Sequence, residues 1–238
     1  MTMANGLDGM AQEKLPASLP VYECKAVDRD LVISGKADDP LWQQAESIAL
    51  GNPIDGKPCR YRTTARMLYS QRCLYIAFAC EDEYVWGTFT EHDADIFTEE
   101  CVEAFICPSG KMRQYYELNV SPRNTVFDAF ILNGRPIGGD RRNLRVLKEF
   151  TCPELVTKVH VDGQLGVRGA KGWSAEYAIP FTSLIGADNL VPQPGDQWRI
   201  NLYRIDSPEP PKLEFYAWSP PGANDYHLPW RFGVLKFR

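Results

Sequence analysis

Short segments of strand-forming residues recur along this chain at intervals of about ten residues, with Pro and Gly turns between them. Leu41–Ala45 reads as a short helical segment, with Trp42 directed into the core, and Pro180–Leu184 reads as a single helical turn. Many short strands with almost no helix are typical of two packed sheets, so we predict an all-β, two-sheet antiparallel β-sandwich. The expected strands are Leu31–Ser34, Thr63–Leu68, Leu74–Cys80, Glu99–Ile106, Gln114–Val120, Asn124–Ile131, Thr157–Val161, Trp173–Ile179, Gln197–Ile205, Lys212–Trp218 and Phe232–Phe237.

Two neighbouring segments of this pattern carry polar side chains in mid-strand. In Cys101–Ile106 the even-numbered apolar side chains share one face of the strand, and Glu103 lies on the other. In Tyr115–Val120 the even-numbered side chains again share a face, opposite Glu117 and Asn119. Carboxylates and an amide held on rigid strands beside aromatic residues suit a ligand rich in hydroxyl groups. The alternative is an outer sheet face that contacts only solvent.

Composition limits the class of protein. The chain has 238 residues, a net charge of −5 and 44% hydrophobic residues, which describes an ordinary globular protein. A chain of this length and pattern commonly forms one domain, so we expect a flexible tail at residues 1–20 and a single sandwich domain at 21–238. No basic stripe exists to neutralise phosphates, and no apolar run is long enough to span a bilayer. We therefore expect neither a nucleic-acid partner nor a membrane partner.

The N-terminal residues and the cysteines are the basis for predicting the cellular compartment. Met1–Ser18 has no apolar stretch of signal-peptide length, and the seven cysteines include no CxxC pair that would favour zinc. An odd cysteine count without a leader suits a reducing compartment, so the expectation is a cytoplasmic protein, or a secreted one if a leader has been removed.

Seven further segments follow one another in an order that resembles family 9 carbohydrate-binding modules. They are Gly35–Trp42, Leu74–Phe78 with Glu81-Asp82, Val102–Ile106, Trp173–Pro180, Gly195–Asn201, Tyr216–Ser219 and Arg231–Leu235. The resemblance covers nearly everything from Leu31 to Arg238. It implies a jelly-roll-like β-sandwich that binds sugars and often contains structural calcium.

The resemblance also implies a sugar site. In the best-known members two tryptophans clamp a sugar ring, and those positions are filled here by Phe97 and Tyr226, which offer less area. An aromatic face suits the C–H patch of a pyranose, while carboxylates and amides bind its hydroxyl groups. We expect the two rings to face each other across a shallow, open groove, with Tyr226 exposed. With the strand residues above, the predicted ligand-binding set is Phe97, Glu103, Glu117, Asn119, Lys212, Asn224 and Tyr226.

Metal and cofactor signals are weaker. Asp93, Asp95 and Glu99 crowd one acidic loop, where their oxygens suit calcium, although such a loop is equally consistent with simple solvation. Haem-binding relatives of this sandwich use Met, His or Lys as axial ligands. Because no spacing pairs Met67 with His160, no haem is expected.

Catalysis is the alternative to binding. Glu103 and Glu117 on adjacent strands are candidates for a general acid and base, if the same cleft has been adapted to transform a small, hydrophobic substrate. We expect a binding protein rather than an enzyme, with a saccharide or other small molecule as ligand. Neither the ligand's identity nor the oligomeric state follows from the residues.

Overall fold

The computed structural model describes residues 18–135 and 143–238. The tail predicted for residues 1–20 therefore lies almost entirely outside the described residues. In the described part of the chain, no helix has the length and apolar composition needed to cross a membrane. Short 3₁₀ turns interrupt the loops, at η1 (Pro40–Gln44), η2 (Ile96–Thr98), η4 (Phe181–Ser183) and η5 (Pro229–Arg231).

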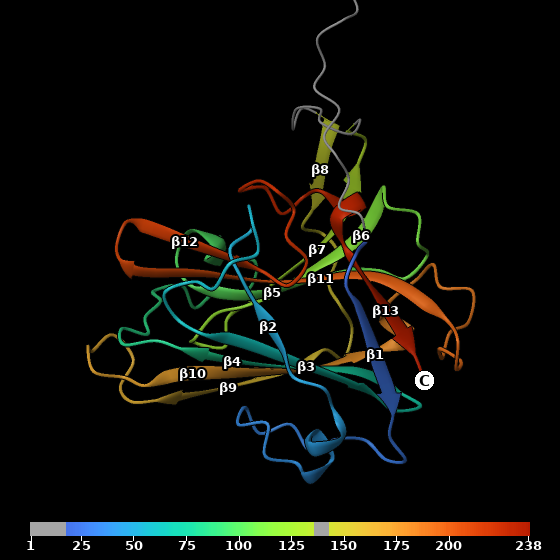
Figure 1. The fold of residues 1–238 in the computed structure, drawn as a ribbon, viewed down its shortest axis with the longest axis horizontal. Coiled ribbons are helices and arrows are strands. Elements are labelled where there is room, and N and C mark those ends of the chain that lie inside the picture. The colour runs from blue at the N-terminus through green and yellow to red at the C-terminus, as the bar shows by residue number, and fades with distance from the viewer. Residues whose placement is uncertain (1–17, 136–142) are drawn as a thin grey trace, which may run out of the picture.

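The strands form two facing sheets, which confirms the predicted all-β sandwich. The order in the first sheet is β8 (Leu144–Leu147), β7 (Val126–Asn133), β6 (Gln114–Val120), β5 (Cys101–Cys107), β11 (Gln197–Glu209) and β13 (Gly233–Phe237), and β12 (Lys212–Ala217) pairs with β11. The order in the second sheet is β3 (Thr63–Tyr69), β4 (Cys73–Glu81), β10 (Gly172–Pro180) and β9 (Val156–Asp162), and β2 (Ile48–Leu50) pairs with β3. In Figure 1, β5 and β11 lie above β3, β4, β10 and β9.

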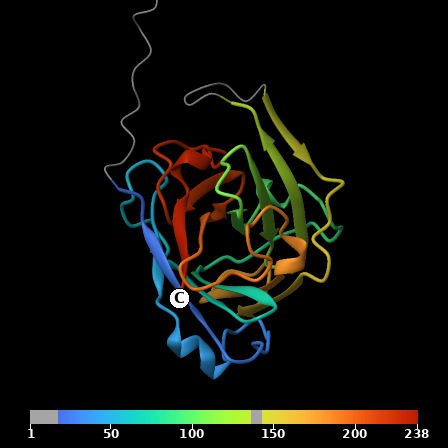
Figure 2. The same ribbon diagram turned by 90° about the vertical axis from the view of Figure 1, so that its right-hand side faces the viewer.

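Strand β1 (Val21–Ala26) joins the two sheets. Its first half pairs with β13, from Val21 opposite Val234, and its end pairs with β3, where Lys25 lies opposite Leu68. Both pairings are parallel, so the prediction of a wholly antiparallel sandwich is wrong for this strand. Figure 2 shows the sheets curling around the space between them, with β1 along one side.

The strand predicted at Leu31–Ser34 does not form, because carboxylates take the place of a neighbouring strand. The backbone N–H of Val32 donates to Asp39 Oδ2 at 2.9 Å, and that of Ser34 donates to Glu176 Oε2 at 2.9 Å. Side-chain acceptors thus satisfy this segment's backbone without a sheet ladder.

The main core lies between the sheets, and the alternation predicted for β5 and β6 holds. Val102 and Leu118 are buried in this core with residues of β3, β4 and β10, whereas Phe105 and Tyr115 join a second apolar cluster on the outer face of the first sheet. β4 is buried on both faces and lies between β3 and β10, as its continuous apolar run predicts. The first sheet is therefore covered on both sides.

Glu176 anchors the loop that covers the outer face of the second sheet. Its carboxylate is fully buried and accepts hydrogen bonds from Trp42 Nε1 at 2.9 Å and from the backbone N–H of Gly35 at 2.6 Å. Trp42 is buried there against Tyr75 and its neighbours. The expected role of Trp42 as a core residue is confirmed.

We predict that Glu176→Ala lowers the free energy of unfolding by about 3 kcal/mol or more, because it leaves several buried donors without an acceptor. Urea denaturation measures the loss. Glu149→Ala, at an exposed position on another loop, should change the free energy of unfolding by less than about 0.5 kcal/mol. Equal effects of the two substitutions would contradict this role of Glu176.

Arg204 on β11 ties the first sheet to the second. Its fully buried guanidinium donates to Thr63 Oγ1 at 3.0 Å, to the carbonyl of Glu81 at 2.9 Å and to Asp82 Oδ2 at 2.8 Å. Ligand oxygens of Asp82, Glu100 and Asp206 lie within 4.8 Å of one another beside it. One guanidinium thus faces three buried carboxyl groups. Burial, with the charges of Asp82 and Asp206, raises the pKa of Glu100 to about 10.

This raised pKa predicts a pH dependence of stability. Between the ordinary glutamate pKa of 4.5 and about 10, the folded chain holds a proton at Glu100 that the unfolded chain has lost. The free energy of unfolding should therefore fall as pH rises through this window. Because Gln cannot ionise, Glu100→Gln should make the fall shallower in urea titrations between about pH 5 and pH 9. Parallel curves for wild type and variant would contradict the assignment, and Glu149→Gln is the control.

Candidate functional site

A cavity of about 560 Å³ opens on the outer face of the first sheet. Its size is within the range of about 300–1,000 Å³ that is usual for small-molecule sites. The lining residues come from η2, β5, β6, β7, β8, β11, β12 and the loop before η5; they are Phe97, Thr98, Glu103, Phe105, Glu117, Phe127, Leu144, Val146, Lys148, Ile205, Leu213, Phe215, Asn224, Tyr226 and His227. A second hollow, of about 420 Å³ over β3, β4 and β10, contains none of the predicted site residues.

Strand register determines which side chains reach the floor of this cavity. Glu103 lies opposite Asn119 across the β5–β6 ladder, and Phe105 lies opposite Glu117. All four therefore lie on one face of the sheet, away from the main core. The neighbouring β11 places Tyr203 opposite Glu103 on the same face.

Most of the predicted ligand residues lie together. Phe97, Glu103, Glu117, Asn224 and Tyr226 line the cavity, although they come from four separate stretches of the chain.

The other two predicted residues occupy different positions. Asn119 is fully buried beneath the lining and donates through Nδ2 to Glu117 Oε1 at 3.0 Å. Lys212 does not line the cavity: its side chain is 78% exposed, and its Nζ lies 3.4 Å from Glu209 Oε2. Lys212 is the first residue of β12, where it pairs with Glu209 across the hairpin.

Tyr226 is not the exposed clamp residue that was predicted. It is only 7% exposed, and its ring stacks on Tyr203 at a centroid distance of 3.9 Å. Its hydroxyl accepts from the backbone N–H of Tyr216 at 3.0 Å and donates toward the carbonyl of Arg204 at 2.9 Å. Tyr226 therefore fixes its loop to the β11–β12 hairpin and contributes to the cavity wall from a buried position.

The expectation that Glu103 opens onto a shallow groove is also wrong. Glu103 is 2% exposed and shares the cavity with Glu117. Burial, reinforced by the charge of Glu117, raises the pKa of Glu103 well above its ordinary value. Burial thus favours the uncharged carboxyl form of Glu103, which can donate as well as accept a hydrogen bond. The floor consequently holds two carboxyl groups, Glu103 and Glu117, in one cavity.

His227 extends this polar floor, and the sequence reasoning missed it. Its Nε2 lies 3.9 Å from Glu117 Oε2, and its Nδ1 lies 2.9 Å from the hydroxyl of Tyr115. The ring packs against Phe105 at a centroid distance of 5.2 Å. His227 directly follows Tyr226, so the predicted aromatic position lies in the loop that also supplies this histidine.

Phe215 is the second missed residue. It lies half-buried on β12, and its ring meets Tyr226 edge-on at a centroid distance of 5.8 Å. The alternation of Leu213, Phe215 and Ala217 within one predicted strand was the available signal. With Phe97, whose ring meets Phe127 at 5.6 Å, it supplies a partly exposed aromatic surface to the cavity.

The carboxylates predicted to bind calcium are directed to different partners. Asp95 Oδ1 lies 2.7 Å from Lys148 Nζ, and Glu99 accepts from the backbone N–H of Thr88 at 2.7 Å. Asp93 instead accepts from the backbone N–H of Asp128 at 3.2 Å. In the described part of the chain these three residues do not form a group whose ligand oxygens lie within 4.8 Å of one another, and calcium binding stays a prediction.

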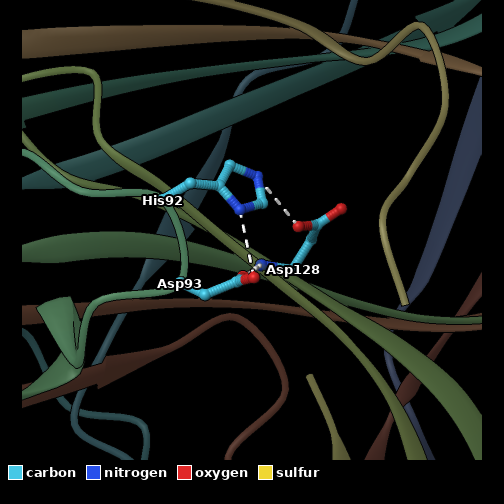
Figure 3. A group of neighbouring side chains, drawn as sticks. All are labelled: His92, Asp93 and Asp128. Carbon is cyan, nitrogen blue, oxygen red and sulfur yellow. Dashed lines mark hydrogen bonds and ion pairs between the residues drawn. The ribbon is translucent and has the colours of Figure 1, made fainter. Parts of the chain in front are cut away.

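Asp93 belongs to a different group, with His92 and Asp128 (Figure 3). His92 Nδ1 lies 3.1 Å from Asp93 Oδ2, and Nε2 lies 3.1 Å from Asp128 Oδ1. Asp128 also accepts from the backbone N–H of Cys152. The group holds the acidic loop against the edge of β7, where the backbone N–H of Asp93 donates to the carbonyl of Val126 at 2.9 Å.

Solved structures share this architecture. A proposed carbohydrate-binding protein from Bacteroides uniformis matches with a TM-score of 0.73 and 17% identity, over 92% of this chain and 99% of that one. A family 9 carbohydrate-binding module from Caldicellulosiruptor kristjanssonii, in complex with cellotriose, matches with a TM-score of 0.63 and 14% identity, over 92% and 94% of the chains. At these identities the likeness shows the fold.

Sequence comparison gives the family. An "Extracellular protein" of Arthroderma benhamiae is 27% identical over 181 residues, which are 74% of this chain and 78% of that protein. The model of carbohydrate-binding family 9 matches residues 55–237, a stretch that includes every residue lining the cavity. The predicted resemblance is thereby confirmed, and the chain belongs to carbohydrate-binding family 9.

Proposed function

We propose that this protein binds a saccharide in the cavity of the first sheet. The observation that carries the proposal is the meeting of Glu103, Glu117 and partly exposed aromatic rings in one cavity of a family 9 chain. The solved relatives from Caldicellulosiruptor kristjanssonii, in complex with cellotriose and with glucose, support a sugar as the class of ligand.

Each part of the cavity suits a different part of a sugar. In its uncharged form, which burial favours, Glu103 donates to a ring or hydroxyl oxygen. Glu117 accepts from a hydroxyl group, and Asn119 donates to its Oε1 at 3.0 Å. Phe97 and Phe215 offer ring surface to the C–H face of the pyranose. Asn224 lies exposed at the opening of the cavity, where its amide reaches outer hydroxyl groups.

We predict that Phe97→Ala weakens saccharide binding about fivefold, because a stacked aromatic contact contributes about 1 kcal/mol. Isothermal titration calorimetry with glucose, cellotriose and a panel of other saccharides measures the change. Leu190→Ala, which removes an exposed apolar side chain outside the cavity, is the matched control and should leave the affinity unchanged. Unaltered affinity in Phe97→Ala would remove this residue from the site, and no heat with any saccharide would count against the proposed function.

Tyr226→Ala is a poor test of binding, because Tyr226 also supports the fold through its buried hydroxyl and its stacking on Tyr203. Loss of binding in that variant would not separate a lost contact from a displaced loop.

A second candidate function is acid–base catalysis on the same ligand, and it is favoured by the enclosure of both glutamates. Glu103 and Glu117 lie in one cavity, and Glu117 has His227 beside it. Different environments for two carboxyl groups are the usual way to obtain an acid and a base at one pH. The pair would then act on a glycosidic bond, with Glu103 donating the proton to the leaving oxygen.

The two functions differ in the effect of Glu103→Gln. For a binding protein we expect no release of nitrophenol from aryl glycosides by the wild type, and a moderate loss of affinity in the variant. Gln keeps a donor at this position, so the loss should stay below about tenfold. Wild-type turnover that disappears in Glu103→Gln, with affinity retained, would instead establish catalysis.

A further inference from the structure

The opening of the cavity has a different chemistry from its floor. Among the lining residues that are exposed or half-buried, the apolar ones come from η2, β8 and β12; they are Phe97, Leu144, Val146, Leu213 and Phe215. The two aromatic rings are assigned to the sugar above, so we call the three aliphatic residues, Leu144, Val146 and Leu213, the apolar rim. Val146 is 39% exposed.

The polar residues at the opening are few and partly engaged. They are Thr98, Lys148 and Asn224. Lys148 Nζ lies 2.7 Å from Asp95 Oδ1 and 5.1 Å from the centre of the Phe127 ring, so its charge is directed to the acidic loop. The outer part of the cavity therefore presents mainly carbon to a ligand.

The floor concentrates the polar groups. Glu103 and Glu117 are buried at the bottom of the cavity, with His227 beside Glu117. The polar groups able to bind the hydroxyl groups of a sugar therefore lie at the bottom of the cavity.

We propose that the ligand is an amphipathic glycoside, which enters with its sugar against Glu103 and Glu117 and leaves an apolar aglycone against the apolar rim. This inference rests on the proposed function, since it specifies the class of saccharide. A second sugar ring at the rim would set its hydroxyl groups against Leu144, Val146 and Leu213, which offer no hydrogen bonds. When an alkyl or aryl group binds at the rim instead, apolar surface of the ligand and apolar surface of the protein are both removed from water.

The test compares matched glycosides that differ only in the aglycone. Methyl and n-octyl β-glycosides of glucose and of galactose are titrated by calorimetry, with the octyl compounds kept below their critical micelle concentrations. We expect at least one octyl glycoside to bind more than tenfold more tightly than its methyl partner, since burial of about two methylene groups is worth tenfold.

Variants of the apolar rim test whether these residues contact the octyl group. Val146→Ser and Leu213→Ser should each reduce the ratio of octyl to methyl affinity severalfold. The ratio is compared because a general effect of the substitution on the site would change both affinities alike. Leu190→Ser changes an exposed leucine outside the cavity and should leave both affinities unchanged. A ratio that survives both rim substitutions would overturn the inference, because the octyl group would then lie elsewhere.

The remaining outcomes separate this inference from the proposed function. Equal affinities of methyl and octyl partners would overturn the amphipathic ligand and leave saccharide binding intact. Binding of 1-octanol as tightly as the octyl glycosides would overturn both, because the sugar would then contribute nothing. An absence of binding by all four glycosides would overturn the amphipathic ligand, and the saccharide panel above, with free glucose and cellotriose, would then decide the proposed function.

Discussion

The alternation of side chains along β5 and β6 is the constraint on which the molecule depends. One set of residues, with Val102 and Leu118, fills the space between the sheets, and the other set, with Glu103 and Glu117, faces the cavity. A slip of one residue would move the carboxyl groups into the apolar core and expose the core residues. The cost of such a slip fixes the register, and the register fixes the cavity floor.

Neighbouring elements hold that floor rigid. Arg204 on β11 binds to groups at the ends of β3 and β4, so the strand beside Glu103 is fastened to the opposite sheet. Tyr226 fastens the loop of Asn224 and His227 to the β11–β12 hairpin through its hydroxyl group. Sugar sites benefit from such order, because a rigid set of polar groups loses little conformational entropy when a ligand binds.

The sequence was sufficient to predict the parts of the structure that depend on a local pattern of residues. Period-two alternation predicted the faces of β5 and β6, and the apolar run of β4 predicted its central place. β1 was missed because only Tyr22 and Cys24 of its six residues are buried and because it pairs in parallel with strands remote in sequence. The prediction of a strand at Leu31–Ser34 was wrong because the carboxylate of Glu176, distant in sequence, accepts a backbone hydrogen bond that a neighbouring strand would otherwise accept.

The candidate site was predicted in two ways. Glu103 and Glu117 follow from alternation, and the family resemblance correctly places Phe97 and Asn224 at the cavity. The resemblance does not determine the direction of a side chain, so Lys212 and Tyr226 were misplaced. Tyr226 turned inward because its hydroxyl finds backbone partners on two strands. The apolar rim was not predicted as a surface, since β8 and β12 meet only in the folded chain, although alternation along β12 marked Leu213.

The central claim is that the cavity of the first sheet is the saccharide site, and a crystal structure of the protein soaked with a saccharide panel tests it most directly. The account predicts density for a sugar in this cavity, with hydroxyl groups within hydrogen-bond distance of Glu103 and Glu117. Sugar density confined to the second hollow over β3, β4 and β10, or elsewhere on the surface, would contradict it.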